Sequence, residues 1–104
     1  MNKYITIATT FDSREEANKI IDQLLEKRLV ACCQLSAIES SYQWQGKVEH
    51  TDEFLIQMKT KKSLYKEIES FILDNHSYET PELIVYDIVG GSDDYLNWIE
   101  SETK

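Results

Sequence analysis

Residues that break or cross-link a chain are scarce in this sequence. Its 104 residues include one proline, three glycines and two cysteines. So little Pro and Gly excludes collagen-like and low-complexity chains, and no stretch has the composition of a linker. The hydrophobic fraction of 41% is typical of a globular protein. We therefore expect one domain that spans residues 1–104.

Long apolar runs are also missing. No segment approaches the roughly 18 consecutive apolar residues that a membrane-spanning helix requires. The apolar patch within residues 1–11 is too short and too polar for the core of a signal peptide. We expect a cytoplasmic protein with no membrane partner.

Basic residues are outnumbered by acidic ones. The 11 Lys and Arg residues and 19 Asp and Glu residues give a formal net charge of -8. Nucleic acids and anionic membranes bind clusters of Lys and Arg. We therefore expect no nucleic-acid partner, and we attribute the dispersed acidity to solubility rather than to a cation-attracting field.

The two cysteines, Cys32 and Cys33, are adjacent in a segment with a β pattern. Neighbouring side chains on a strand point to opposite faces, so an ordinary disulfide between them is not expected. The pair matches neither a redox Cys-x-x-Cys motif nor a zinc-ligand spacing. We expect one thiol in the core and the other at an interface.

The clearest local signal is a long hairpin. Apolar and polar residues alternate over residues 48–59, residues 29–41 contain no Gly or Pro, and the segment Tyr42-Gln-Trp-Gln-Gly-Lys47 joins the two. Period-two alternation beside a turn glycine predicts a strand, a turn and a strand. Each arm is about double the usual strand length. A domain this small cannot cover such arms by itself.

Strands and helices alternate in the rest of the chain. Residues 3–9 are expected to form a short apolar strand. Asp12 or Ser13 caps a helix that ends near residue 28, and Ser13-Arg-Glu-Glu16 is a capping-box pattern. Ser63 is positioned to cap a second helix, which ends near Asn75 or His76. Residues 83–89 are almost continuously apolar, which predicts a fourth strand in the centre of the sheet. Ser92 opens a third helix after Gly90-Gly91.

This element order, β-α-β-β-α-β with an additional C-terminal helix, predicts an α+β fold of the ferredoxin-like kind. In that arrangement two helices cover one face of a four-stranded antiparallel sheet. The other face and the edges of the long hairpin, with Tyr42, Trp44, Phe54 and Ile56 nearby, would stay exposed. Exposed apolar strands aggregate unless they are paired, and closed association of identical copies pairs them. We favour such an oligomer over a hairpin that bends back on its own domain.

Five segments recur together in a known family. They are Leu29-Val-Ala-Cys-Cys33, Ser41-Tyr-Gln-Trp-Gln-Gly-Lys-Val-Glu49, the strand that ends in Lys59-Thr60, His76-Ser-Tyr-Glu-Thr-Pro-Glu82 and Tyr95-Leu-Asn-Trp98. Their order and spacing resemble the CutA divalent-cation tolerance family over essentially the whole chain. The patterns Tyr-x-Trp-x-Gly-Lys and His-x-Tyr-x-x-Pro-Glu carry most of the specificity.

The resemblance implies a ferredoxin-like subunit in a tight homotrimer, similar to the PII-type signalling proteins. It also implies a cytoplasmic protein linked to the tolerance of copper and other divalent cations. No reaction is attached to the family, so we expect no enzymatic activity. The open alternatives are a PII-like trimer that binds a small metabolite in clefts between subunits and a scaffold for a protein partner.

A metal site is implied at one residue only. Copper binding in the family is associated with a Cys at the end of the first strand and a His pair before the His-x-Tyr segment. Ala8 and Asn75 stand at two of those positions, so His76 is the remaining ligand, and we expect a weakly held divalent ion such as copper or zinc. The alternative is a helix-end His satisfied by the helix dipole and a loop carboxylate. His50 is expected on the surface.

A second group of residues suits a cleft between subunits. The candidates are Cys32, Trp44, Lys59, Tyr78, Glu79 and Glu82. A Lys beside aromatic and acidic side chains suits an anionic or planar small molecule. Tyr and Trp are also enriched at subunit contacts whatever the function, and that alternative stays open. No base lies near Cys32 in the sequence, so catalysis by this thiol is not expected.

Overall fold

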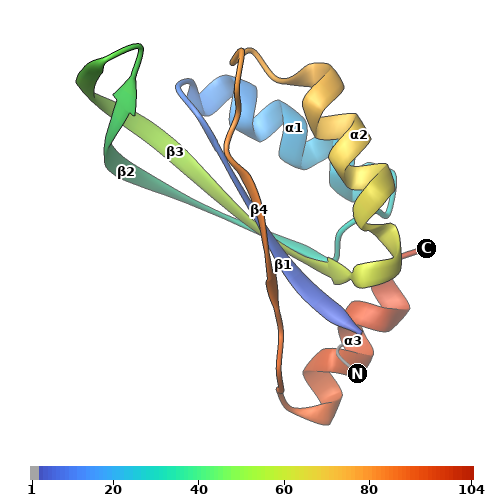
Figure 1. Ribbon diagram of the computed structural model, residues 1–104. Helices are drawn as coiled ribbons and strands as arrows, with labels where there is room; N and C mark the ends of the chain where they lie inside the picture. The colour runs from blue at the N-terminus through green and yellow to red at the C-terminus, as the bar shows by residue number, and fades with distance from the viewer. Residues whose placement is uncertain (1–2) are drawn as a thin grey trace.

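The computed structural model describes residues 3–104 (Figure 1). Its elements are β1 (Tyr4–Phe11), α1 (Arg14–Glu26), β2 (Cys32–Trp44), β3 (Lys47–Lys61), a short 3-10 turn (Lys62–Leu64), α2 (Tyr65–Asn75), β4 (Leu83–Asp87) and α3 (Asp93–Glu102). The predicted α+β class and element order are confirmed. No helix among the described residues is long and apolar enough to cross a membrane.

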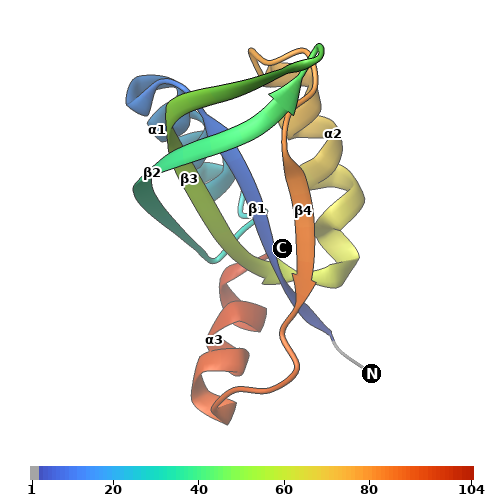
Figure 2. The same cartoon turned by 60° about the vertical axis from the view of Figure 1, so that its left-hand side comes forward.

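The four strands form one antiparallel sheet with the order β2-β3-β1-β4. Helices α1 and α2 lie side by side on one face of it, as Figures 1 and 2 show. Alternate residues of β1 and β3 meet the two helices there. The buried cluster consists of Ile5, Ile7, Phe11, Ala17, Ile20, Leu24, Leu29, Val30, Ile56, Met58, Ile68 and Ile72.

The helix starts follow the predicted caps in two cases of three. Ser13 Oγ accepts a hydrogen bond from the Glu16 backbone N–H (3.2 Å), and Ser92 Oγ accepts one from the Tyr95 N–H (3.3 Å). The expected cap at Ser63 is wrong, because residues 62–64 form the 3-10 turn and α2 begins at Tyr65 without a side-chain cap.

The prediction that the fourth strand is central is wrong. β4 pairs with β1 alone and forms an edge of the sheet. Ile84, Val85 and Tyr86 are 41%, 39% and 53% exposed, and Leu83 packs against the core cluster. A continuous apolar run indicates burial on both faces, but among residues 3–104 no strand pairs with the free edge of β4.

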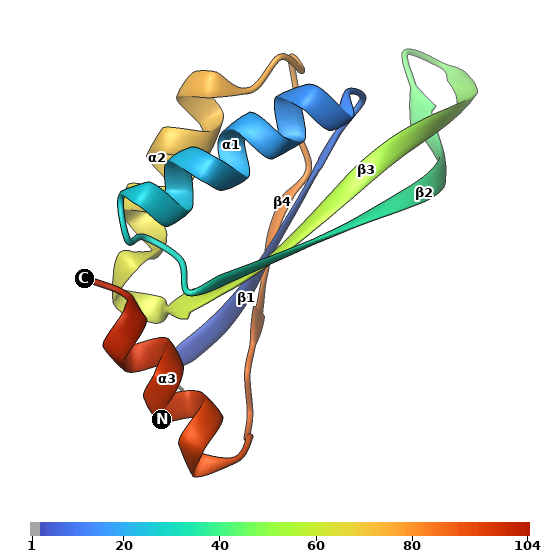
Figure 3. The same ribbon diagram turned by 180° about the vertical axis from the view of Figure 1, so that it is seen from behind.

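The hairpin is as long as predicted, with 13 residues in β2 and 15 in β3. A two-residue turn joins Trp44 to Lys47, and both its residues have positive φ (Gln45 50°, Gly46 79°), as a type I′ turn requires. β3 pairs with β1 only between Phe54 and Lys61, so the outer half of the hairpin pairs with itself alone. Figures 1 and 3 show this arm projecting from the body.

The sheet face opposite α1 and α2 is partly covered. Tyr4 and Lys61 alternate with the core-facing residues of their strands and therefore point to this second face. Both contact Glu100 of α3, at 3.0 Å from the Tyr4 hydroxyl and 3.3 Å from Lys61 Nζ. The face that was predicted to be open is therefore covered by α3 at the end that carries Tyr4 and Lys61.

Candidate functional site

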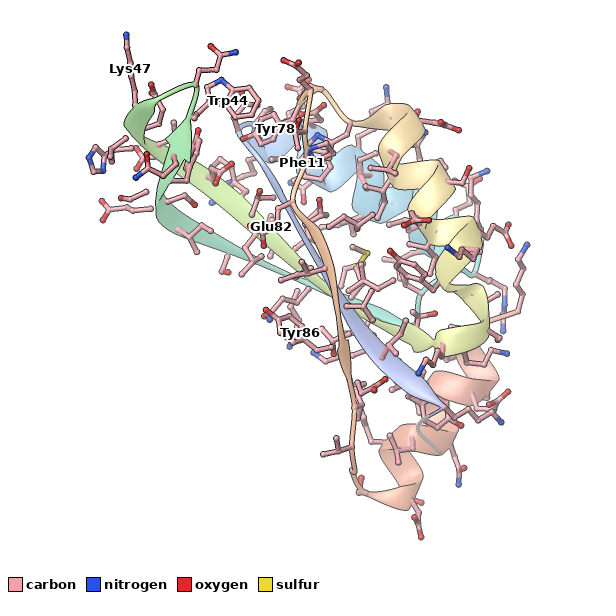
Figure 4. All side chains as sticks on the ribbon, viewed as in Figure 1. Phe11, Trp44, Lys47, Tyr78, Glu82 and Tyr86 are labelled. Atoms are coloured by element: carbon pink, nitrogen blue, oxygen red, sulfur yellow. The ribbon has the colours of Figure 1, made fainter. Side chains whose placement is uncertain are left out.

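The segment that follows α2 begins with His76, whose extended backbone ends the helix. The His76 imidazole stacks on the ring of Phe11, the last residue of β1, with centroids 4.1 Å apart and an interplanar angle of 10°. The Tyr78 ring lies on its other flank, 4.9 Å between centroids. Figure 4 shows Phe11 and Tyr78 close together where β1 ends. His76 is thus half-buried between two aromatic rings.

Hydrogen bonds occupy both ring nitrogens of His76. Nε2 lies 2.8 Å from the Thr10 carbonyl oxygen, and Nδ1 lies 3.1 Å from the backbone nitrogen of Tyr78. A carbonyl oxygen can only accept and a backbone N–H can only donate. Nε2 therefore carries the proton, Nδ1 offers its lone pair to Tyr78, and the imidazole is held as the neutral Nε2–H tautomer.

Tyr78 connects the same segment to the hairpin. Its hydroxyl donates a hydrogen bond of 2.6 Å to Oε2 of Glu53 in β3. Glu53 is 6% exposed, and a buried carboxylate is costly unless a donor faces it. Burial first, and then the bond to Glu53, hold the pKa of Tyr78 well above its usual value, so the hydroxyl keeps the proton that it donates.

These residues do not fit a bound copper or zinc ion. Such an ion needs two to four converging donors with free lone pairs. Both nitrogens of His76 are engaged, and Glu79 and Glu82 are exposed. Among residues 3–104 no group of three or more His, Cys, Asp or Glu side chains is placed to hold a metal ion. Ligation by His76 stays a prediction, and it requires the imidazole to give up a hydrogen bond.

Two of the predicted cleft residues lie on the second face of the sheet. Lys59 and Cys32 are cross-strand partners, and the Lys59 ammonium donates to the Gln34 side-chain oxygen. The neighbouring thiol, Cys33, packs against the core, and burial together with the Cys32 thiol raises the pKa of Cys33 to about 12. Both thiols are free, as predicted, and one of them lies in the core. The interface role of Cys32 stays a prediction.

The cleft candidates do not form one site within a chain. Lys59 lies opposite Thr6 of β1, while Glu82 precedes Leu83, which lies opposite Thr9 on the other side of β1. Glu82 is therefore four positions from the level of Lys59, about 13 Å along the strands, and two strand spacings add about 10 Å across the sheet. Figure 4 places Glu82 on the segment that leads into β4, and Trp44 lies near the hairpin tip, 37% exposed.

Two hollows lie on the projecting hairpin. One of about 580 Å³ is lined by Arg14, Ala37, Ile38, Glu39, Asp52, Glu53 and Phe54. The other, of about 330 Å³, is lined by residues 39–41 and 50–52. Neither contains His76, Lys59 or Glu82. His50 lies exposed in the second hollow, where its Nδ1 is 2.8 Å from Ser41 Oγ, so its predicted place on the surface is confirmed.

Glu53, the most buried acid of this region, could not be recognised from the sequence. Glu53 occupies a polar position in the alternating run, where a solvent-facing side chain is expected. Its partner, Tyr78, is 25 residues away in the chain. Only a pattern that linked the hairpin to the His-x-Tyr segment could have paired them.

The fold and this arrangement define a class of protein, a ferredoxin-like α+β subunit with an overlong hairpin and a His-x-Tyr segment closed onto β1 and β3. The sequence profile described as CutA1 divalent ion tolerance protein matches residues 5–102. The chain therefore belongs to the CutA1 divalent ion tolerance family.

Individual relatives agree with the family match. The chain is 37% identical to the chloroplastic protein CutA of Arabidopsis thaliana over 96% of its own length, but it spans only 56% of that protein. It is also 37% identical to the divalent-cation tolerance protein CutA of Pyrococcus horikoshii, over 96% of this chain and 98% of that one. The structure of the periplasmic divalent cation tolerance protein CutA from Archaeoglobus fulgidus superimposes with a TM-score of 0.94 at 35% identity, over 97% and 99% of the two chains.

Proposed function

We propose that this protein is a non-enzymatic divalent-cation tolerance protein that works in the cytoplasm as a homotrimer. The observation that carries the proposal is the family match, which extends over residues 5–102 and therefore over the whole folded domain. The poor reactivity expected of the half-buried Cys33 thiol, whose pKa is raised to about 12, supports the absence of catalysis by that thiol.

The surface of the single chain supports the oligomer. The edge strand β4 presents Ile84 and Tyr86 on the sheet face opposite α1 and α2, and the hairpin presents Tyr42, Trp44 and Val48, all more than a third exposed. An edge strand and a self-paired arm with such residues invite pairing with another chain. A closed ring of identical copies satisfies every edge at once, whereas an open array would aggregate.

Native mass spectrometry tests the assembly. We expect a complex with the mass of three chains of 12.2 kDa. Ile84→Lys places a charge on the sheet face opposite α1 and α2, where Ile84 pairs with Ala8, and should release monomers. Leu25→Lys is the matched control, because Leu25 is similarly exposed (40% against 41% for Ile84) but lies on α1. A wild-type monomer, or equal dissociation by the two variants, would overturn the proposed trimer.

Growth tests the cellular role. Deleting the gene should lower the concentration of copper or zinc salts that the cell tolerates, and expression of this chain should restore it. Expression of the Ile84→Lys variant should restore it less well if the trimer is the working form. Unchanged tolerance after deletion would contradict the proposed function.

We propose the role in tolerance without an ion site preformed in the single chain, since the described residues offer no converging ligands. The second candidate function, a metabolite bound in clefts between subunits, is favoured by the placement of Lys59 on the second face beside Gln34. We rank it second because Glu82, its expected counterpart, lies on the far side of β1 in the same chain.

A further inference from the structure

We propose that His76 is a positioning residue that locks the His-x-Tyr segment, residues 76–82, onto the end of β1 and the middle of β3, and that this role withholds its imidazole from metal ions. The inference does not depend on the proposed trimer. It assigns to His76 a function in place of the metal ligation that the family resemblance implies.

The first step is the chemistry of the ring. Metal coordination uses a nitrogen lone pair. The Nδ1 lone pair faces the Tyr78 N–H, and Nε2 has its proton directed at the Thr10 carbonyl. An ion bound at Nδ1 would displace the Tyr78 N–H from that lone pair. An ion bound at Nε2 would take the place of its proton, so the Thr10 carbonyl would lose its donor and face a ring that carries a cation. Either way a half-buried backbone group loses its partner.

The second step is the set of anchors on consecutive residues. His76 is held on β1 by the Thr10 bond and the Phe11 stack. Ser77 donates to the Glu16 carboxylate of α1 at 2.9 Å, and Tyr78 donates to Glu53 of β3 at 2.6 Å. The segment therefore contacts three elements within three residues. Its conformation is fixed before any ligand or partner arrives.

The third step is the dependence of the Tyr78 contact on His76. The imidazole Nδ1 accepts the backbone N–H of Tyr78, and the two rings lie 4.9 Å apart. Both contacts restrict the backbone and the ring orientation from which the hydroxyl reaches Glu53. Loss of the imidazole frees them, and the buried Glu53 carboxylate then loses its donor for part of the time. His76 therefore acts on the hairpin through Tyr78.

Nitrogen NMR of the unmodified protein tests the ring directly. The chain has two histidines, so a sample labelled with ¹⁵N at the imidazoles gives two sets of signals, and His50 is the internal control. At about pH 8, above the usual titration range of histidine, His76 should show the Nε2–H tautomer. Addition of Zn(II) in several-fold excess should leave its signals in place. An Nδ1–H tautomer, or a saturable shift of the His76 nitrogens with Zn(II), would overturn the proposal.

Hydrogen exchange of the Tyr78 amide tests the positioning role. His76→Ala should speed this exchange roughly five- to tenfold, the effect of losing about one hydrogen bond. His76→Asn, whose side-chain oxygen can accept near the position of Nδ1, should recover part of the protection. His50→Ala is the control on the hairpin and should change nothing. Equal protection in His76→Ala and the wild type would contradict the role, and so would exchange in His76→Asn as fast as in His76→Ala.

Discussion

The Tyr78 hydroxyl and the Glu53 carboxylate join two segments that are 25 residues apart through a hydrogen bond of 2.6 Å. Glu53 lies where β3 leaves β1 and continues into the free arm of the hairpin, since the pairing of β3 with β1 starts at Phe54. The bond thus fixes the family's His-x-Tyr segment to the base of the arm. Two features recognised separately in the sequence are in contact at this one point.

Tyr78→Phe should lower the free energy of unfolding by about 2 kcal/mol, because it leaves a buried carboxylate without its donor. Tyr65→Phe is the matched control: the Tyr65 hydroxyl bonds Glu69 at 2.7 Å on α2, but Glu69 is 31% exposed and water can replace the donor. We expect the control to cost less than about 1 kcal/mol. Urea unfolding at equal protein concentrations measures both, and equal losses would contradict the argument.

The hairpin and the two covering helices could be predicted because their patterns are local. Alternation along β3 places Ile56 and Met58 on the helix-covered face, and three-four spacing on α1 places Ala17, Ile20 and Leu24 against them. Each pattern is visible within its own stretch of sequence, so the strand and the helix can be predicted without knowing which distant segment they pack against. The same reasoning fixed the turn at Gly46.

The position of β4 and the burial of Glu53 could not be predicted for a common reason. An apolar strand signals that both faces are covered, but it does not say by what, and Val85 of β4 is 39% exposed in the single chain. Glu53 has an ordinary polar place in its own strand, and its burial depends on a loop 25 residues away. Local patterns report periodicity, whereas these two features depend on contacts between distant segments.

Thr9→Val should raise the free energy of unfolding by about 1 kcal/mol. Thr9 is fully buried, and among the described residues its Oγ1 is a buried side-chain atom without a hydrogen-bond partner. The substitution removes an unpaired hydroxyl at almost constant volume. Thr60→Val is the contrasting control, because the equally buried Thr60 donates to the Leu29 carbonyl at 2.6 Å. That variant should lose about 1 to 2 kcal/mol, and a loss in both would contradict the assignment.

Glu100 should make the stability depend on acid pH. Hydrogen bonds from Lys3 first, then from Tyr4, lower the pKa of Glu100 from 4.5 to about 2. A carboxyl with a lowered pKa contributes stability that is complete above its ordinary pKa and is lost as the pH falls through the folded value. The stability difference between the wild type and Glu100→Gln should therefore narrow as the pH falls from about 4.5 to about 2.

Urea midpoints measured across that pH range check the Glu100 prediction. The Lys3 side chain is 63% exposed and that of Glu100 39%, so salt screens this contact and the difference should also shrink in high salt, although Lys61 is only 13% exposed. Glu26→Gln, on the exposed surface of α1, is the control for removing one negative charge from an acidic protein. A gap between wild type and Glu100→Gln that stays constant with pH would show that Glu100 acts through packing rather than through its charge.

Gly46 tests whether the hairpin tip is set by backbone conformation. Its φ of +79° lies in the left-handed region, and a Cβ placed there would meet nothing within 4 Å. Gly46→Ala should therefore cost about 1 kcal/mol through strain alone. Gly90→Ala also meets open space but has no positive φ, so it should be close to neutral. Gln45→Asn should stabilise the turn by a few tenths of a kcal/mol, because Asn adopts positive φ more readily than Gln. Unfolding free energies that rank Gly46→Ala and Gly90→Ala alike would mean that a contact of the tip, and not its turn, fixes the hairpin.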